Sequence, residues 1–179
     1  LPLVTLAGPY LDELSALTGD TVHLGIREGD EVLYLLKNPG RNGPEMRSRV
    51  GHRKPLARTG IGKALMLDDS PKDWQRLYDI SLPAGGKSQF WPQHPQQSWE
   101  QLEQRMTEYV AGGYAFDLED NEPSIRCVAA PIRDASKGIV AAISIASTVP
   151  YMPLEKMAEL IPLIKGVTAR LSAELGLKV

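Results

Sequence analysis

The residues best suited to chemistry lie in the stretch Thr59-Gly60-Ile61-Gly62-Lys63-Ala64. Thr59 is a good N-cap residue, so the two glycines should lie in the first turn of a short helix. That turn presents backbone N–H groups and partial positive charge, which together can bind a small carboxylate or phosphate. The glycines are equally compatible with close packing of this turn on a sheet. The stretch is not a P-loop, because that motif needs a four-residue gap between its glycines and a Ser or Thr after the lysine.

The single cysteine and the three histidines form no catalytic or metal-binding pattern. One cysteine excludes a disulfide framework and a four-thiolate metal site. The histidines, His23, His52 and His94, are scattered and have no ligand spacing. Cys127 lies in an apolar stretch, and the adjacent Arg126 should point to the opposite face of its strand, whereas a reactive thiolate needs positive surroundings. We therefore expect no enzyme, no metal and no cofactor, and a cysteine-dependent enzyme is the weakest of the alternatives.

The composition indicates one globular domain without nucleic-acid or membrane signals. Hydrophobic residues make up 42% of 179 residues, which suffices for a core. The net charge of −2 lacks the excess of positive charge that is typical of nucleic-acid-binding domains. The sequence contains neither a signal peptide nor an apolar run of membrane-spanning length. A cytoplasmic protein is the expectation.

The elements that must position these residues can be predicted from hydrophobic spacing and turn residues. Apolar residues three or four apart predict helices, and period-two stretches between turn residues predict strands. On this basis we predict helices at 2–18, 59–68, 71–78, 98–111 and 153–175, a hairpin of strands 21–27 and 31–36, strands at 46–50 and 114–118, and a hairpin of strands 124–134 and 138–147. This order predicts an α+β domain in which an antiparallel sheet of about six strands is covered by helices.

A basic loop lies between the first hairpin and the glycine stretch. Its positively charged residues, set against the single acid Glu45, are Arg41, Arg47, Arg49, Arg53, Lys54 and Arg58. They fit a solvated sheet edge. They also fit a rim that draws anions inward or holds a partner subunit. The sequence leaves both interpretations open.

The second hairpin should have two unlike faces. A four-residue loop at 135–138 sets a register with the opposed pairs Asp134–Ile139, Ala129–Ser144 and Cys127–Ala146. Because side chains alternate, one face carries Ile125, Cys127, Ala129, Ala142, Ser144 and Ala146. The other face carries Ile139, Ala141, Ile143 and Ile145, and it should meet helices. A face of small residues leaves room for a ligand or for a closely packed helix.

Six stretches stand out in order along the chain: Leu14 to Leu24, Val50-Gly51-His52-Arg53-Lys54-Pro55-Leu56, Thr59 to Ala64, Gly113 to Asp117, Ile125 to Ile132 and Ala141 to Ser147. Taken together, they resemble the C-terminal effector-binding domain of the IclR family of bacterial transcription regulators. The chain departs from the family pattern at Asp120, where Glu is usual, and at Arg133, where an aromatic residue or His is usual. Ala146 replaces a frequent serine, which removes one hydroxyl from the expected pocket.

The resemblance implies a profilin-like or GAF-like sheet with a small-molecule pocket, in a protein that forms dimers or tetramers. It implies that residues 1–18 are the end of an inter-domain linker helix packed on the domain, and that residues 19–179 bind the effector. In such proteins a winged helix-turn-helix domain comes first. No such segment precedes Leu1 here, so we expect this chain to bind an effector, and DNA only through the absent domain. Effector binding would shift a conformational population that the helix passes on.

The family's pocket, transferred by position, falls on Met46, Gly60, Ile61, Asp117, Ile125, Cys127 and Ser144. The chemistry of these residues agrees with an acid that carries polar groups further along. The N–H groups of Gly60 and Ile61 can bind a carboxylate, an ionised Asp117 can accept from a hydroxyl or amine, and Ser144 can donate or accept. A sugar acid, a hydroxy acid or a keto acid fits.

Each of these residues also has a purely structural interpretation. Asp117 could cap the following turn, Cys127 could be a small buried hydrophobe, and Ser144 could bond to backbone. At the level of function, the alternative to an effector-binding domain is an oligomerisation module whose pocket is no longer used.

Overall fold

Among residues 2–178, which this computed structural model describes, six strands form one antiparallel sheet. The strands are β1 (Thr21–Glu28), β2 (Glu31–Asn38), β3 (Arg53–Pro55), β4 (Ala115–Leu118), β5 (Ile125–Arg133) and β6 (Ile139–Thr148), in the spatial order β3-β2-β1-β6-β5-β4. The predicted α+β class with an antiparallel sheet is confirmed. Leu1 of the expected linker segment and Val179 at the other end lie outside the described residues.

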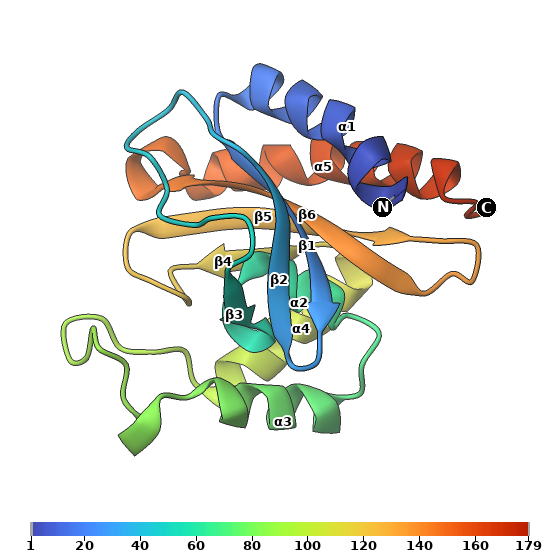
Figure 1. The fold of residues 1–179 in the computed structure, drawn as a ribbon. Helices are drawn as coiled ribbons and strands as arrows, with labels where there is room; N and C mark the ends of the chain where they lie inside the picture. The colour runs from blue at the N-terminus through green and yellow to red at the C-terminus, as the bar shows by residue number, and fades with distance from the viewer. Residues whose placement is uncertain (1, 179) are drawn as a thin grey trace.

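Helices cover both faces of the sheet (Figure 1). One face packs against α1 (Pro2–Thr18) and α5 (Leu154–Glu174), while α2 (Gly60–Leu65) and α4 (Trp99–Gly112) lie on the other face, with α3 (Pro71–Ser81) outside them. Short 3-10 turns occur at Leu56–Arg58, Ala84–Gly86 and Val149–Tyr151. The sheet thus separates two apolar cores, one under α1 and α5 and one under α2 to α4. All predicted helices are present, with ends shifted by a few residues.

Local sequence signals account for the ends of the helices. Ser98 and Gln101 form the capping box of α4, and Gly113 ends this helix in the left-handed conformation at φ 72°. Ser70 caps α3, with Pro71 at its first position.

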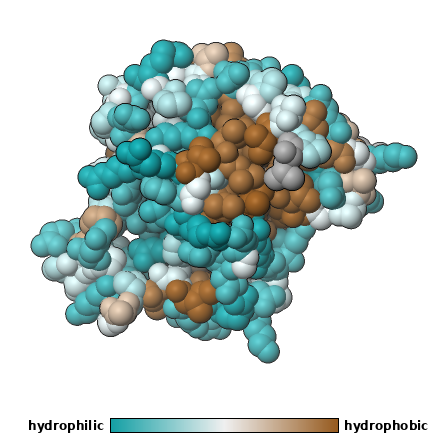
Figure 2. Space-filling model, viewed as in Figure 1, coloured by the Kyte–Doolittle hydropathy of each residue, from teal (hydrophilic) through white to brown (hydrophobic). Residues whose placement is uncertain are grey.

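None of the helices in residues 2–178 has both the length and the apolar character that crossing a membrane requires. Figure 2 shows an apolar area in the upper centre of the face in view, over the strands below α1.

The predicted strand at 46–50 is wrong. Residues 39–52 form a loop, and the third strand of this region is instead β3, which pairs with Glu31–Leu33 of β2. The ammonium group of Lys37 explains the difference, since it donates to the carbonyl oxygens of Met46 and Ser48 at 2.7 Å each. A side chain thereby takes carbonyl groups that a sheet ladder would have used.

The register of the second hairpin is confirmed except at its turn. Ala129 lies opposite Ser144, and Cys127 lies opposite Ala146. A bulge between Ile132 and Arg133 places Arg133, rather than Asp134, opposite Ile139. Because one extra residue reverses the facing of the residues beyond the bulge, Ile139 packs with the core under α2 to α4, and not with Ile143 and Ile145 as predicted.

The start of α2 is held by close packing at both glycines. Thr59 caps the helix by accepting a hydrogen bond from the N–H of Gly62 at 2.9 Å. A Cβ atom at Gly62 would collide with the carbonyl oxygen of Leu56, and one at Gly60 would collide with the sulfur of Cys127. The close-packing interpretation of these glycines is therefore correct, and it does not exclude a role at a pocket.

Two helical glycines test this packing. Gly62→Ala should destabilise the domain by about 1–3 kcal/mol, because the added methyl meets backbone that cannot move aside. Gly166→Ala in α5 is the matched control, since a Cβ atom there meets nothing within 4 Å, and it should stabilise by about 0.5–1 kcal/mol. Urea unfolding of both variants measures the difference. Equal effects would contradict the packing argument.

Candidate functional site

All seven residues of the predicted site line one cavity of about 270 Å³ between the sheet and the start of α2. Its floor comes from β5 and β6, with Ile125, Cys127, Ser144 and Ala146, and Asp117 of β4 stands beside them. Gly60 and Ile61 form one wall, and Met46 belongs to the loop 39–52 on the other side. At about 30 Å³ per water, the cavity has room for about nine water molecules.

Asp117 serves the cavity and the following turn at once. It is 4% exposed, and its Oδ1 accepts a hydrogen bond from the backbone N–H of Asp120 at 2.8 Å. The turn-capping interpretation is therefore correct, alongside the position in the cavity lining. Burial raises the pKa of Asp117 to about 7, and the charge of Asp120 adds to the rise while Lys63 opposes it. Near neutral pH this carboxyl group can accept a hydrogen bond or donate one.

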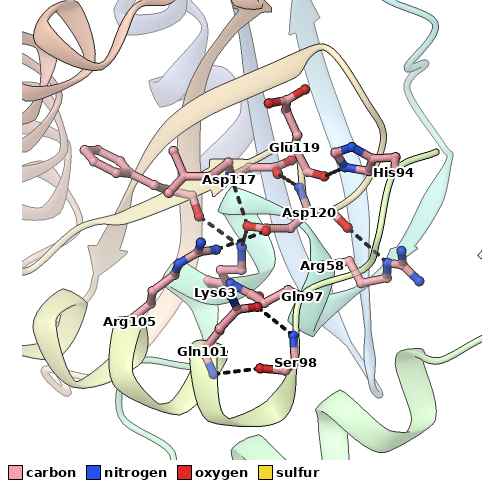
Figure 3. A network of polar contacts seen from close by, with 12 residues as sticks. Arg58, Lys63, His94, Gln97, Ser98, Gln101, Arg105, Asp117, Glu119 and Asp120 are labelled. Carbon is pink, nitrogen blue, oxygen red and sulfur yellow. Dashed lines mark hydrogen bonds and ion pairs between the residues drawn. The ribbon is translucent and has the colours of Figure 1, made fainter. Parts of the chain in front are cut away.

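A buried ion-pair network holds the turn that carries Asp117 (Figure 3). Lys63 of α2 is fully buried, and its ammonium group donates to Asp120 Oδ2 at 2.5 Å and to the carbonyl oxygen of Phe116 at 3.0 Å. Arg105 of α4 reaches Asp120 Oδ1 at 3.1 Å. Burial alone would raise the pKa of Asp120, but Lys63 outweighs it and holds this pKa below its usual value. The network therefore ties the β4–β5 turn to two helices.

The thiol of Cys127 is neutral and structural. Its pKa is raised, chiefly by burial and also by the charge of Asp117. His23 lines the same cavity as this cysteine. Burial, with a contribution from Lys37, lowers the pKa of His23 to about 4. A neutral thiol and a neutral imidazole in one cavity do not supply the thiolate that nucleophilic catalysis requires.

The sequence analysis missed a second group of polar residues in the cavity. His23 of β1, Tyr34 of β2 and Ser48 of the loop 39–52 lie at its other end, where His23 Nε2 and Ser48 Oγ are 2.5 Å apart. The rings of His23 and Tyr34 pack with centroids 5.1 Å apart. The alternation of strand 21–27 places His23 on a defined face, but only the β1–β6 pairing shows that this face belongs to the cavity.

The basic loop divides between the cavity and other partners. Arg47 and Lys54 line the cavity, together with His52. Arg53 instead pairs with Glu28 at 2.5 Å, and Arg58 donates to the carbonyl oxygen of Asp120 at 3.3 Å. Part of the loop is thus a cationic rim, and part is an ordinary set of surface contacts. Within residues 2–178, no cluster of three or more His, Cys, Asp or Glu side chains could hold a metal ion.

Comparison with known proteins gives consistent matches over nearly all of the chain. A protein-family model described as bacterial transcriptional regulator IclR C-terminal matches residues 1–173. The HTH-type transcriptional regulator XynR of Escherichia coli is 31% identical over 172 residues, which are 93% of this chain and 64% of that protein. The HTH-type transcriptional regulator KdgR of the same organism is 28% identical over 175 residues, covering 97% of this chain and 64% of that protein. The chain therefore spans under two thirds of the length of these relatives.

Solved structures agree with the fold. The crystal structure of the Agobacterium tumefaciens repressor BlcR superposes with a TM-score of 0.84 at 28% identity, covering 100% of this chain and 69% of that one. The Thermotoga maritima IclR structure superposes with a TM-score of 0.83 at 28% identity, covering 98% of this chain and 69% of that one.

The buried ion pair is open to a stability test. Lys63→Met should lower the free energy of unfolding by about 3–5 kcal/mol, because it leaves the buried carboxylate of Asp120 without its main counterion. Arg105→Met is the control. That side chain is 29% exposed and contacts the same carboxylate from the rim, so its loss should cost under about 1 kcal/mol. Denaturant unfolding at pH 7 compares the two variants. Similar losses of unfolding free energy would show that Lys63 is not the main counterion of Asp120.

The raised pKa of Asp117 predicts a pH-dependent stability difference. The folded-state pKa of about 7 exceeds the ordinary value of 3.8, so the stability that this group contributes below about pH 4 is lost as pH rises through 7. Asp117→Asn cannot ionise and still accepts the Asp120 N–H bond. It should unfold at a higher temperature than the parent at pH 8, and at a similar temperature at pH 4.

Asp134→Asn is the control for this measurement. Its hydrogen bonds, chiefly from Ser136, lower the pKa of Asp134, so the sign reverses. This variant should be no more stable than the parent at pH 8. If the unfolding temperatures of the parent and of Asp117→Asn differ by the same amount at pH 4 and at pH 8, the raised pKa of Asp117 is contradicted.

Proposed function

Because the chain belongs to the IclR family of bacterial transcriptional regulators and corresponds to their C-terminal domain, we propose that it binds the effector of such a regulator in the cavity beside α2. The effector is a small carboxylate that carries further oxygen groups, such as a sugar acid, a hydroxy acid or a keto acid. The relatives are named as regulators and repressors, and the chain is a regulatory domain rather than an enzyme.

The observation that supports this proposal most strongly is the combination of charges in one cavity. Arg47 and Lys54 supply positive charge at its rim, and Gly60 and Ile61 at the start of α2 line the same space. Asp117 supplies a buried carboxyl group that can accept from, or donate to, an oxygen of the ligand. A carboxylate with a polar group further along satisfies both.

The loop 39–52 provides a physical route from the cavity to α1. Its middle part reaches the cavity with Met46, Arg47 and Ser48. Its first part holds the end of α1, since the Arg41 guanidinium donates to the carbonyl oxygens of Ser15 and Ala16 at 3.4 Å each. We take α1 as the end of the linker helix to the DNA-binding domain. A ligand that binds one position of this loop more tightly would then bias the position of α1.

A thermal-shift screen of small carboxylates tests the proposal. An acid that binds the folded domain should stabilise it by about 2.7 kcal/mol at a concentration of one hundred times Kd. Asp117→Ala should lose this shift while remaining folded. Asp69→Ala is the control, because Asp69 pairs with Arg27 at 2.9 Å outside the cavity, and it should keep the shift.

Two outcomes would count against the proposal. If no acid shifts the midpoint while sedimentation shows that the chain self-associates, the alternative of an oligomerisation module replaces it. If Asp117→Ala keeps the full shift, the domain binds acids elsewhere.

A further inference from the structure

We propose that residues 87–93 form a lid at the entrance of the cavity, which closes when the effector binds and contacts the effector through Gln89. Phe90 then seals the entrance beside it. This inference rests on the proposed function and extends it, because it adds a ligand-contacting segment that the seven predicted site residues do not include. The structure shows the lid in its open position.

Three connecting segments meet at the entrance, on the left in Figure 1: the loop 39–52, the β4–β5 turn and the long loop 82–98 between α3 and α4. Gln89 of the long loop lines the cavity itself. Phe90 lines an outer space of about 320 Å³. The cavity and the outer space share the lining residues Met46, Arg47, Glu122 and Ile125. The outer space is therefore the way in, and the tip of the long loop borders it.

The base of the long loop is fixed to the domain. His94 Nε2 donates to the carbonyl oxygen of Glu119 in the β4–β5 turn at 2.6 Å (Figure 3). The hydroxyl of Tyr78 donates to the carbonyl oxygen of Gln97 at 2.7 Å. The side-chain amide of Gln96 donates to the carbonyl oxygen of Gly86 at 2.7 Å and so joins the two ends of the loop. Movement is thereby confined to the residues between Gly86 and His94.

The lid itself has no bond to the rest of the domain. In the part of the chain that the structure describes, all hydrogen bonds of residues 87–93 stay within 88–94, where Ser88 accepts from the N–H groups of Phe90 and Trp91, and Phe90 accepts from that of His94. A segment without bonds to the core opens and closes at a low cost in free energy.

Two glycines supply the hinge. Gly85 and Gly86 have φ values of 84° and 76°, and a Cβ atom at either would meet nothing within 4 Å. Both positions therefore have room to change conformation. Lys87 is the only Lys, Arg, Asp or Glu of the loop 82–98, and its ammonium group lies over the Trp91 ring at 5.4 Å. The inner edge of the lid can thus approach the charged rim without like-charge repulsion.

The polar side chains at the entrance are free to bind a ligand. Arg47, Gln89 and Glu122 all line the cavity, and none of these side chains takes part in a hydrogen bond or ion pair among residues 2–178. Arg47 can bind the carboxylate of an effector, and the Gln89 amide can donate to an oxygen of the same ligand from the lid. Closure also brings the half-buried Phe90 ring into the apolar part of the outer space, which favours the closed lid.

Calorimetric titration tests the contact made by Gln89. The probes are gluconate, glycerate and pyruvate, which are a sugar acid, a hydroxy acid and a keto acid, and the tightest binder is carried forward. Gln89→Ala should weaken it by about 5–15-fold, because one hydrogen bond to the ligand is lost. Gln93→Ala is the matched control, since this glutamine of the same lid lines neither space, and it should keep the parent affinity.

Stopped-flow displacement tests the seal. Phe90→Ala should raise the dissociation rate of the same acid by about 5–10-fold and leave its association rate unchanged, because the apolar contact forms only after the ligand has entered. Trp91→Ala removes the neighbouring aromatic ring, which lines neither space, and should change neither rate.

Limited digestion with trypsin follows the closure directly. Cleavage after the exposed Lys87 should slow several-fold when the acid is saturating, because the closed lid is held against the domain. Lys137 is the control. It lies in the exposed β5–β6 turn outside the cavity lining, so cleavage there should not slow to the same extent.

The outcomes separate this inference from the function on which it rests. If the acid binds the parent, but either Gln89→Ala or Phe90→Ala keeps the parent affinity and dissociation rate, the lid is refuted and the proposed function remains. Equal slowing of cleavage at Lys87 and Lys137 leads to the same conclusion, since the ligand then stabilises the domain without closing a lid. If neither these three acids nor any other small carboxylate binds the parent, both are overturned.

Discussion

The buried pair of Lys63 and Asp120 is the interaction on which the rest of the site depends. A lysine with no exposed surface is tolerated only with a counterion and further hydrogen bonds, and here Asp120 and the carbonyl oxygen of Phe116 provide them. The pair fastens α2 to the β4–β5 turn. Because Gly60 stands at one end of that short helix and Asp117 at the start of that turn, the same contact fixes the two sides of the cavity relative to each other.

This arrangement makes the ionised form of Asp117 energetically unfavourable, and a bound ligand can offset part of that cost. The carboxyl group is buried beside another carboxylate, and the single nearby lysine already serves Asp120. Its raised pKa reports that cost, and perturbed groups of this kind gather where proteins bind ligands. A ligand oxygen that hydrogen-bonds Asp117 would relieve part of it. The stability lost by burying this group is therefore available as affinity.

Local patterns predicted the elements and the small-residue face of the second hairpin, the family resemblance supplied the predicted site residues, and long-range pairing decided the rest of the cavity. Loop length and alternation sufficed to place Ser144 opposite Ala129, because both strands of that hairpin are adjacent in sequence. The bulge that displaces Ile139 left no comparable signal. His23 and Tyr34 were missed because β1 joins the sheet beside β6, a strand more than a hundred residues later. The loop 39–52 was misjudged because Lys37 competes with strand pairing for its carbonyl groups.

The row of small residues on β5 and β6 is compatible both with a packed helix and with a ligand, and the start of α2 divides it between the two. Ala129 and Ala142 lie in the core beneath the helix. Cys127, Ser144 and Ala146 border the open space. The boundary falls where the backbone of Gly60 meets the sulfur of Cys127, a contact too close for any other residue at 60. One glycine thus allows α2 to approach the sheet closely and still leave a cavity beyond its first turn.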